Sequence, residues 1–126
     1  MVYRLLGGVE QVHLIPPLDY WSFVRVMARS YLIPTDSGGV QEEAPSLRKP
    51  VLVLRTVTER PEAAEAGLAK IIGTDTQRIV DETSALLRDR KLYERMSAGV
   101  NPYGDGRAAQ HIAEALLKYF AQEGLS

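Results

Sequence analysis

Short apolar runs alternate with segments of helical spacing along the first half of the chain. Turn-forming residues bound the apolar runs, which are expected to be strands, at 12–15, 31–33, 51–54 and 70–72. Two of these runs carry no polar alternation, which is typical of strands buried on both faces of a parallel sheet. Segments 19–29 and 39–47 have the apolar spacing of helices. The order strand, helix, strand, helix, strand predicts an α/β domain.

The sequence pattern predicts mostly helices in the second half of the chain. Asp75 is expected to cap a helix whose apolar residues recur at three and four positions through Leu87. A short helix at 91–97 and an amphipathic helix at 108–120 are expected on either side of a turn cluster at 101–106. Four strands are few for a three-layer domain. Either the sheet is small, or its first strands belong to chain that is missing here.

Composition excludes several classes of protein. The 126 residues fit one domain, and 15 basic against 16 acidic residues give a net charge of -1, which excludes a general electrostatic grip on nucleic acid. No cysteine is present, so disulfides, thiolate nucleophiles and cysteine-based zinc sites are excluded. His13, expected to be structural within a buried strand, and His111, expected to be exposed, are too few for a metal centre. No apolar run approaches the roughly 20 residues of a membrane span, so a cytoplasmic protein is expected.

The stretch 35–44 is the most informative one, because two glycines separate an expected strand from an expected helix. Unpaired N–H groups at a helix N-terminus hold phosphates, and Gly38 and Gly39 lack a Cβ that would keep a phosphate away from the backbone. Ser37 adds a hydroxyl donor. Open α/β sheets also bind ligands beyond the carboxyl ends of their strands. The alternative is a serine cap followed by a tight turn, and this local pattern alone leaves both interpretations open.

Glu43 lies about one helical turn, roughly 6 Å, beyond Gly39 and shares its face of the helix. A carboxylate there could accept hydrogen bonds from the vicinal hydroxyls of a ribose. Its alternative role is to complement the helix dipole. The neighbouring Glu42 points elsewhere on the helix and is expected to be solvated.

Two further loops follow expected strands. In 55–62, Arg60 sits on a backbone stiffened by Pro61, and its guanidinium suits phosphate oxygens. The alternative to phosphate binding is a solvated loop whose charged residues pair with one another. Glu59 and Glu62 flank Arg60, and an ion pair with it is expected to keep them ionised. In 17–23, Phe23 could face a base ring, although such a residue more often lies in the core.

These stretches, in this order, resemble the C-terminal half of the non-hydrolysing UDP-N-acetylglucosamine 2-epimerases. The resemblance covers about residues 9 to 120, and its motifs are 12–15, 17–20 with Phe23, 32–47, 49–55, 58–62, 66–67, 73–75 and 101–106. It implies two Rossmann-like domains arranged as in B-type glycosyltransferases, with the nucleotide between them. Residues 1–126 would form the single UDP-binding domain, a three-layer Rossmann-like unit with a mostly parallel sheet.

The resemblance also implies a reaction and a set of contacts. The reaction is the interconversion of UDP-N-acetylglucosamine and UDP-N-acetylmannosamine by elimination of UDP and its re-addition, without cofactor or metal, in enzymes that are usually homodimers. Residues of this half would contact UDP as follows: Phe23 near the uracil, the backbone around Leu18 also at the uracil, Ser37, Gly38 and Gly39 at the diphosphate, Glu43 at the ribose, and Arg60. No catalytic residue is assigned to this chain.

Departures from the family pattern qualify that function. The family's acid and base carboxylates and its histidine belong to an N-terminal half that this chain lacks. Thr56 stands where an acidic residue is usual, Arg48 where a glycine is usual, and Leu68 and Pro34 are also atypical. The expected partners are therefore a UDP-sugar, a missing N-terminal half and a second copy, with no nucleic acid and no membrane. The alternatives are a stand-alone UDP-sugar-binding or interaction module without catalysis, and a domain of a B-type glycosyltransferase.

Overall fold

The computed structural model describes residues 1–122 and 124 of the chain. Its elements are α1 (Val2–Leu6), α2 (Tyr20–Arg29), β1 (Ile33–Thr35), α3 (Gly38–Glu43), the 3₁₀ helix η1 (Ala44–Leu47), β2 (Val51–Val53), α4 (Pro61–Glu65), β3 (Ala69–Ile71), α5 (Thr76–Arg88), α6 (Arg90–Ser97) and α7 (Ala108–Gln122). The alternation of strands and helices predicted for the first half is confirmed from α2 to β3.

The three strands form one parallel sheet in the order β1-β2-β3. Ile33 pairs with Val51, and Val51 pairs with Ala69, so the strands are in register from their first residues. Because each strand is added on the same side of the last, both crossovers, through α3 and through α4, lie on one face. All three strands end at the same edge of the sheet, and the loops that follow them share that edge.

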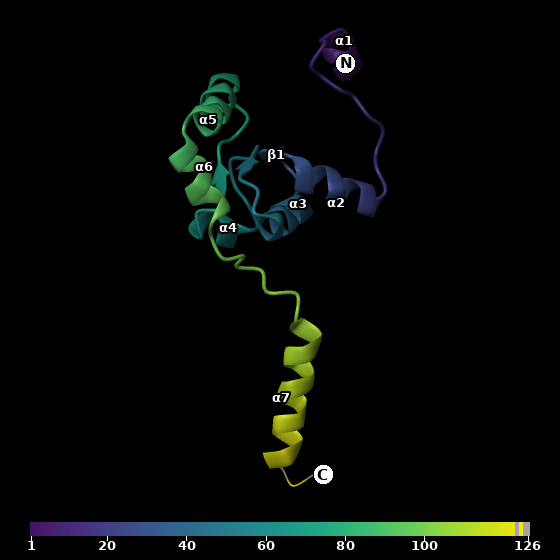
Figure 1. Cartoon of the computed structure of the whole chain (residues 1–126), viewed down its shortest axis with the longest axis vertical. Coiled ribbons are helices and arrows are strands. Elements are labelled where there is room, and N and C mark those ends of the chain that lie inside the picture. Colours follow the sequence, from purple (N-terminus) through teal and green to yellow (C-terminus); the bar gives the residue numbers. More distant parts are fainter. Residues whose placement is uncertain (123, 125–126) are drawn as a thin grey trace.

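The sheet separates two apolar cores, which makes the domain three-layered (Figure 1). On one face, Val51 and Val53 pack with residues of α2, η1 and α4. On the other face, Leu52 packs with Leu86 of α5 and Met96 of α6. Successive residues of a strand point to opposite faces, so β2 needs an uninterrupted apolar sequence, and its three residues are all buried.

The expected strand at 12–15 is wrong, because this segment has no regular structure. A strand exists only when its backbone pairs with a neighbour, and none of the described strands lies beside it. Ile15 is 56% exposed, and His13 is exposed rather than structural within a buried strand. The expected 31–33 strand begins two residues later, at Ile33.

Side-chain caps start α2, α5 and α6. Asp19 and Asp75 each accept a hydrogen bond from the backbone N–H three residues on, at 3.0 and 2.9 Å, as the sequence predicts for Asp75. The hydrogen bonds from Ser22 hold the pKa of Asp19 below its ordinary value. Asp89 caps α6 in the same way. Helix α4 was not predicted from the sequence.

Helix α7 projects away from the sheet and its covering helices (Figure 1). None of its residues is buried. Its large apolar side chains are exposed, namely Ile112, Leu116, Leu117, Tyr119 and Phe120. Among residues 1–122 and 124, no helix is long and apolar enough to cross a bilayer.

Candidate functional site

The diglycine turn, Gly38 and Gly39, is the start of α3 and follows the end of β1, close to where the sequence predicts it. Ser37 caps α3: its Oγ accepts from the N–H of Val40 at 3.4 Å, and its own N–H donates to Thr35 Oγ1 at 3.1 Å. The predicted serine cap is therefore present in the structure. It does not compete with anion binding, because the N–H groups of Gly38 and Gly39 begin the helix and have no acceptor within it.

Nothing in the packing of residues 1–122 and 124 explains why residues 38 and 39 are glycines. A Cβ on Gly38 would meet no heavy atom within 4 Å, and one on Gly39 would meet only Ser37 Oγ at 3.9 Å. Neither glycine has the positive φ that favours this residue type. The space beside both Cα atoms is thus open, so no side chain would keep a phosphate away from the backbone N–H groups of the turn.

Glu43, at the last position of α3, is joined to α2. Its Oε2 accepts a 3.0 Å hydrogen bond from the Tyr20 hydroxyl. This hydrogen bond and the negative charge of Glu43 raise the pKa of the Tyr20 phenol. Both side chains line a shallow pocket of about 180 Å³, together with Val24, Ser46 and Leu47. A carboxylate accepts several hydrogen bonds, so Glu43 keeps capacity for ligand hydroxyls.

Arg60 lies after β2, at the same sheet edge as the diglycine turn. Its guanidinium pairs with Glu42 of α3. The expectation that Glu42 is simply solvated is therefore wrong, as is the expected pairing of Arg60 with Glu59 and Glu62. The cause is the parallel pairing of β1 with β2, which places α3 beside the loop after β2.

Two buried or half-buried polar residues support the Arg60 loop and were missed in the sequence. Gln41 of α3 is buried, and its Oε1 accepts from Thr58 Oγ1 at 2.6 Å. The hydroxyl of Tyr103 donates to the Arg60 carbonyl at 3.2 Å and accepts from the N–H of Ala63 at 3.3 Å. Burial raises the pKa of this Tyr103 phenol. No local sequence signal could have found contacts that span 17 to 43 residues.

Phe23 and Leu18 lie on the rim rather than in the core. Phe23 of α2 is 37% exposed, which contradicts the alternative of a core residue. It stands one helical turn from Tyr20, the partner of Glu43. Leu18 precedes the Asp19 cap and is 36% exposed. The place of these two side chains at a uracil stays a prediction.

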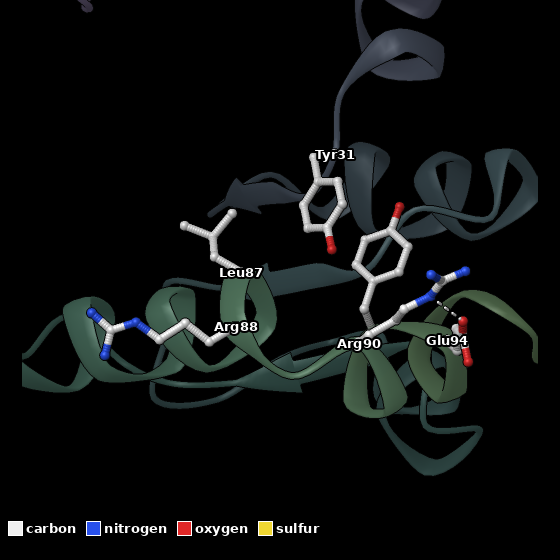
Figure 2. Close-up of a pocket in the computed structure, with 6 residues that line it drawn as sticks. Tyr31, Leu87, Arg88, Arg90 and Glu94 are labelled. Carbon is white, nitrogen blue, oxygen red and sulfur yellow. Dashed lines mark hydrogen bonds and ion pairs between the residues drawn. The ribbon is translucent and has the colours of Figure 1, made fainter.

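A separate pocket of about 420 Å³ lies near the opposite edge of the sheet, around Tyr31, which precedes β1. Tyr31 stacks on Tyr93 with ring centroids 4.1 Å apart. Figure 2 shows Arg90 turned toward Glu94, with which it forms an ion pair, and Arg88 pointing away from Tyr31. The polar groups do not converge on one point, so this pocket offers no defined ligand site.

Comparison with known proteins gives a consistent result. Residues 1–117 match the family profile described as UDP-N-acetylglucosamine 2-epimerase. The chain is 57% identical to the Escherichia coli K12 protein of that name over 115 residues, which are 91% of this chain and 31% of the relative. The Salmonella typhimurium relative is 57% identical over 118 residues, 94% of this chain and 31% of the relative. The chain spans about a third of the length of these curated relatives.

Solved structures agree with this assignment. A Neisseria meningitidis UDP-GlcNAc 2-epimerase bound to UDP-GlcNAc superimposes with a TM-score of 0.87 at 51% identity, over 93% of this chain and 32% of that one. The S. aureus MnaA–UDP co-structure also gives 0.87, at 47% identity, over 99% of this chain and 33% of that one. The matching fold is a three-layer α/β unit with a parallel sheet, as observed here. The chain therefore belongs to the UDP-N-acetylglucosamine 2-epimerase family, of which it matches the C-terminal part.

Proposed function

We propose that this chain is the UDP-binding part of an enzyme that interconverts UDP-N-acetylglucosamine and UDP-N-acetylmannosamine. One observation carries the proposal: two glycines at the start of α3 whose absent side chains serve no packing need. They lie in a chain whose relatives are named for a UDP-sugar reaction. Free N–H groups at the carboxyl edge of a parallel sheet are suited to a diphosphate.

The proposal gives each site residue a role. Ser37, Gly38 and Gly39 hold the diphosphate, and the Arg60 guanidinium adds positive charge to it. Glu43 accepts from the ribose hydroxyls. Phe23 and the backbone at Leu18 contact the uracil. In support, the exposed Phe23 lies one turn from Tyr20, which bonds Glu43, so a base and a ribose bound there would be neighbours.

In this proposal, the catalytic groups lie outside the given chain. Epimerisation at C2 needs one group to remove a proton and others to assist the departing diphosphate. Four acids lie near the strand ends, namely Asp36, Glu43, Glu59 and Glu62. Glu43 is assigned to the ribose, and Asp36 precedes the phosphate-binding turn. We propose that the reacting groups lie in the part of the relatives that this chain does not match. The apolar side chains of α7 are exposed and are suited to pack against that part. The same proposal includes a homodimer of the complete enzyme and a cytoplasmic location.

Replacing Glu43 with glutamine tests the roles of the site. If Glu43 binds ribose, Glu43→Gln weakens UDP binding by about 5- to 30-fold, because a hydrogen bond to a charged acceptor contributes ~1–2 kcal/mol more than one to a neutral acceptor. Inorganic pyrophosphate, which has no ribose, loses little. Glu114→Gln on α7 is the matched control and leaves both ligands unchanged. Equal losses for UDP and pyrophosphate would remove Glu43 from the ribose and leave it a role in joining α2 to α3.

A further inference from the structure

Two consecutive residues of α3 join that helix to the loop after β2. Glu42 pairs with the Arg60 guanidinium, while Gln41 reaches the same loop from inside. Gln41 is only 1% exposed, and its Oε1 accepts from Thr58 Oγ1 at 2.6 Å. Thr58 Oγ1 in turn accepts from the backbone N–H of Arg60 at 3.0 Å. A relay of two hydrogen bonds thus runs from a buried amide to the backbone of Arg60.

The hydrogen bond between Gln41 and Thr58 is better suited than the ion pair between Glu42 and Arg60 to hold this loop in one place. The side chains of Arg60 and Glu42 are 45% and 39% exposed, so water and salt screen their attraction. An exposed ion pair of this kind contributes little to holding a loop in one place. The Gln41 amide is shielded from water, so water can compete for its hydrogen bond only at the half-buried Thr58 hydroxyl.

Gln41 is an unfavourable residue at this position if only the stability of the fold is considered. Its Nε2 is buried and has no hydrogen-bond partner among the described residues. A buried donor left unpaired destabilises a fold, and an apolar side chain of similar length would remove that penalty. Thr58 is only half-buried, so its hydroxyl could turn to water if Gln41 were absent. The stability of the domain therefore gives no reason for an amide here.

We infer that Gln41 is a positioning residue for the diphosphate site, acting on Arg60 through Thr58. The inference rests on the proposed function. Gln41 belongs to the same short helix as Gly38 and Gly39, so one element carries both the phosphate-facing N–H groups and the connection to Arg60. Holding the two halves of an anion site at a fixed spacing before the ligand arrives reduces the ordering cost of binding.

Replacing Gln41 with methionine separates positioning from stability. Gln41→Met keeps the length of the side chain and removes both polar atoms. We expect the midpoint of urea unfolding to stay equal or rise, while UDP and pyrophosphate both bind about 3- to 10-fold more weakly, the range of one net hydrogen bond. UDP binding is followed by amide chemical shifts in an NMR titration of the full chain. Gln11→Met, in the exposed segment between α1 and α2, is the control and changes neither quantity.

A double-mutant cycle shows whether Gln41 acts through Arg60. Arg60→Ala is expected to weaken UDP binding, and adding Gln41→Met to that variant should not weaken UDP binding further. Thr58→Val removes the same relay from its other end and takes the place of Gln41→Met if that variant does not fold. Either variant should also speed hydrogen exchange at the amides of residues 57–60 without UDP present.

The outcomes distinguish the inference from the proposed function. If Arg60→Ala weakens UDP but neither Gln41→Met nor Thr58→Val does, the inference is wrong and the proposed function stands. The inference is also wrong if Gln41→Met weakens UDP equally in the Arg60→Ala background. If the unmodified chain does not bind UDP, the proposed function is wrong, and the inference falls with it. If Arg60→Ala leaves the UDP affinity unchanged, Arg60 has no part in the diphosphate site, and the inference is wrong while the role of the two glycines stands.

Discussion

The Tyr20 hydroxyl donates to Glu43 Oε2 at 3.0 Å, which joins the first residue of α2 to the last residue of α3. The two helices lie on the same face of the sheet, and this hydrogen bond crosses the pocket between them. It brings the segment that contains Phe23 to the carboxylate proposed to bind ribose. A uracil site and a ribose site are thereby placed on one surface.

The first prediction concerns the titration of Tyr20. Glu43 raises the pKa of this phenol, so its absorbance change near 295 nm, isolated by subtracting Tyr20→Phe, is expected above the ordinary tyrosine value of about 10. Since the folded-state pKa is the higher one, the contribution to stability is present below the unfolded-state pKa and is lost as pH rises through the folded-state pKa. Glu43→Gln should return the titration toward the ordinary value. An unchanged titration in that variant would show that the two groups do not interact in solution.

The sequence predicted the parts of the fold that local chemistry determines. Ser37 and Asp75 cap helices within three residues of themselves, and the all-apolar β2 has the pattern of a central strand. The segment 12–15 has a similar apolar pattern but no partner, and pairing is a property of the whole chain. Pattern alone therefore could not tell a strand from an unpaired extended segment.

The candidate site was predictable where it is one continuous stretch and unpredictable where it is assembled. Ser37, Gly38 and Gly39 are consecutive, and their chemistry can be derived from backbone N–H groups alone. The partner of Arg60 is 18 positions away on α3, although two acids lie within two positions of it in the sequence. The buried Gln41 could not be found either, because burial depends on which elements pack over a residue.

The second prediction concerns Arg48, which stands where the family pattern usually has glycine. Arg48 has φ 55° and ψ 42°, the left-handed region. Arg48→Gly should raise the free energy of unfolding by about 0.5–1 kcal/mol, because relief of the left-handed strain exceeds the added flexibility of the unfolded chain. Lys49→Gly, at the adjacent position without a positive φ, should lower it by a similar amount. Urea unfolding measures both, and a loss of stability in Arg48→Gly would contradict the strain.

The third prediction concerns the contact of Gly99 with Leu68. A Cβ at Gly99 would collide with Leu68 Cδ2, and Leu68 is buried beside β3. Gly99→Ala is therefore expected to destabilise the domain by about 1–3 kcal/mol, the usual cost of overpacking. Shortening the partner should relieve the collision, so adding Leu68→Val should restore part of the loss. Additive losses in the double variant would show that the two positions do not compete for space.

The fourth prediction is that the chain alone does not epimerise. A half-site open to water cannot supply the ~8 kcal/mol or more of barrier lowering that enzymes provide. Incubation with UDP-N-acetylglucosamine in deuterated water should place no deuterium at C2 of the sugar. Incorporation above a protein-free control, abolished by Glu59→Gln or Glu62→Gln, would assign catalysis to this chain.

Titration of the chain with UDP, repeated with Gly38→Ala, tests the central claim most directly. A Cβ at Gly38 meets no protein atom, so Gly38→Ala should unfold at the same or a higher urea concentration than the unmodified chain. The unmodified chain should bind UDP with a Kd of about 0.1–1 mM, equivalent to about 4–6 kcal/mol, and Gly38→Ala should bind it at least ~10-fold more weakly because the new methyl group occupies the path of the diphosphate. Equal UDP affinity for the two proteins, or no binding to the unmodified chain at several millimolar UDP, would contradict a diphosphate site at this turn.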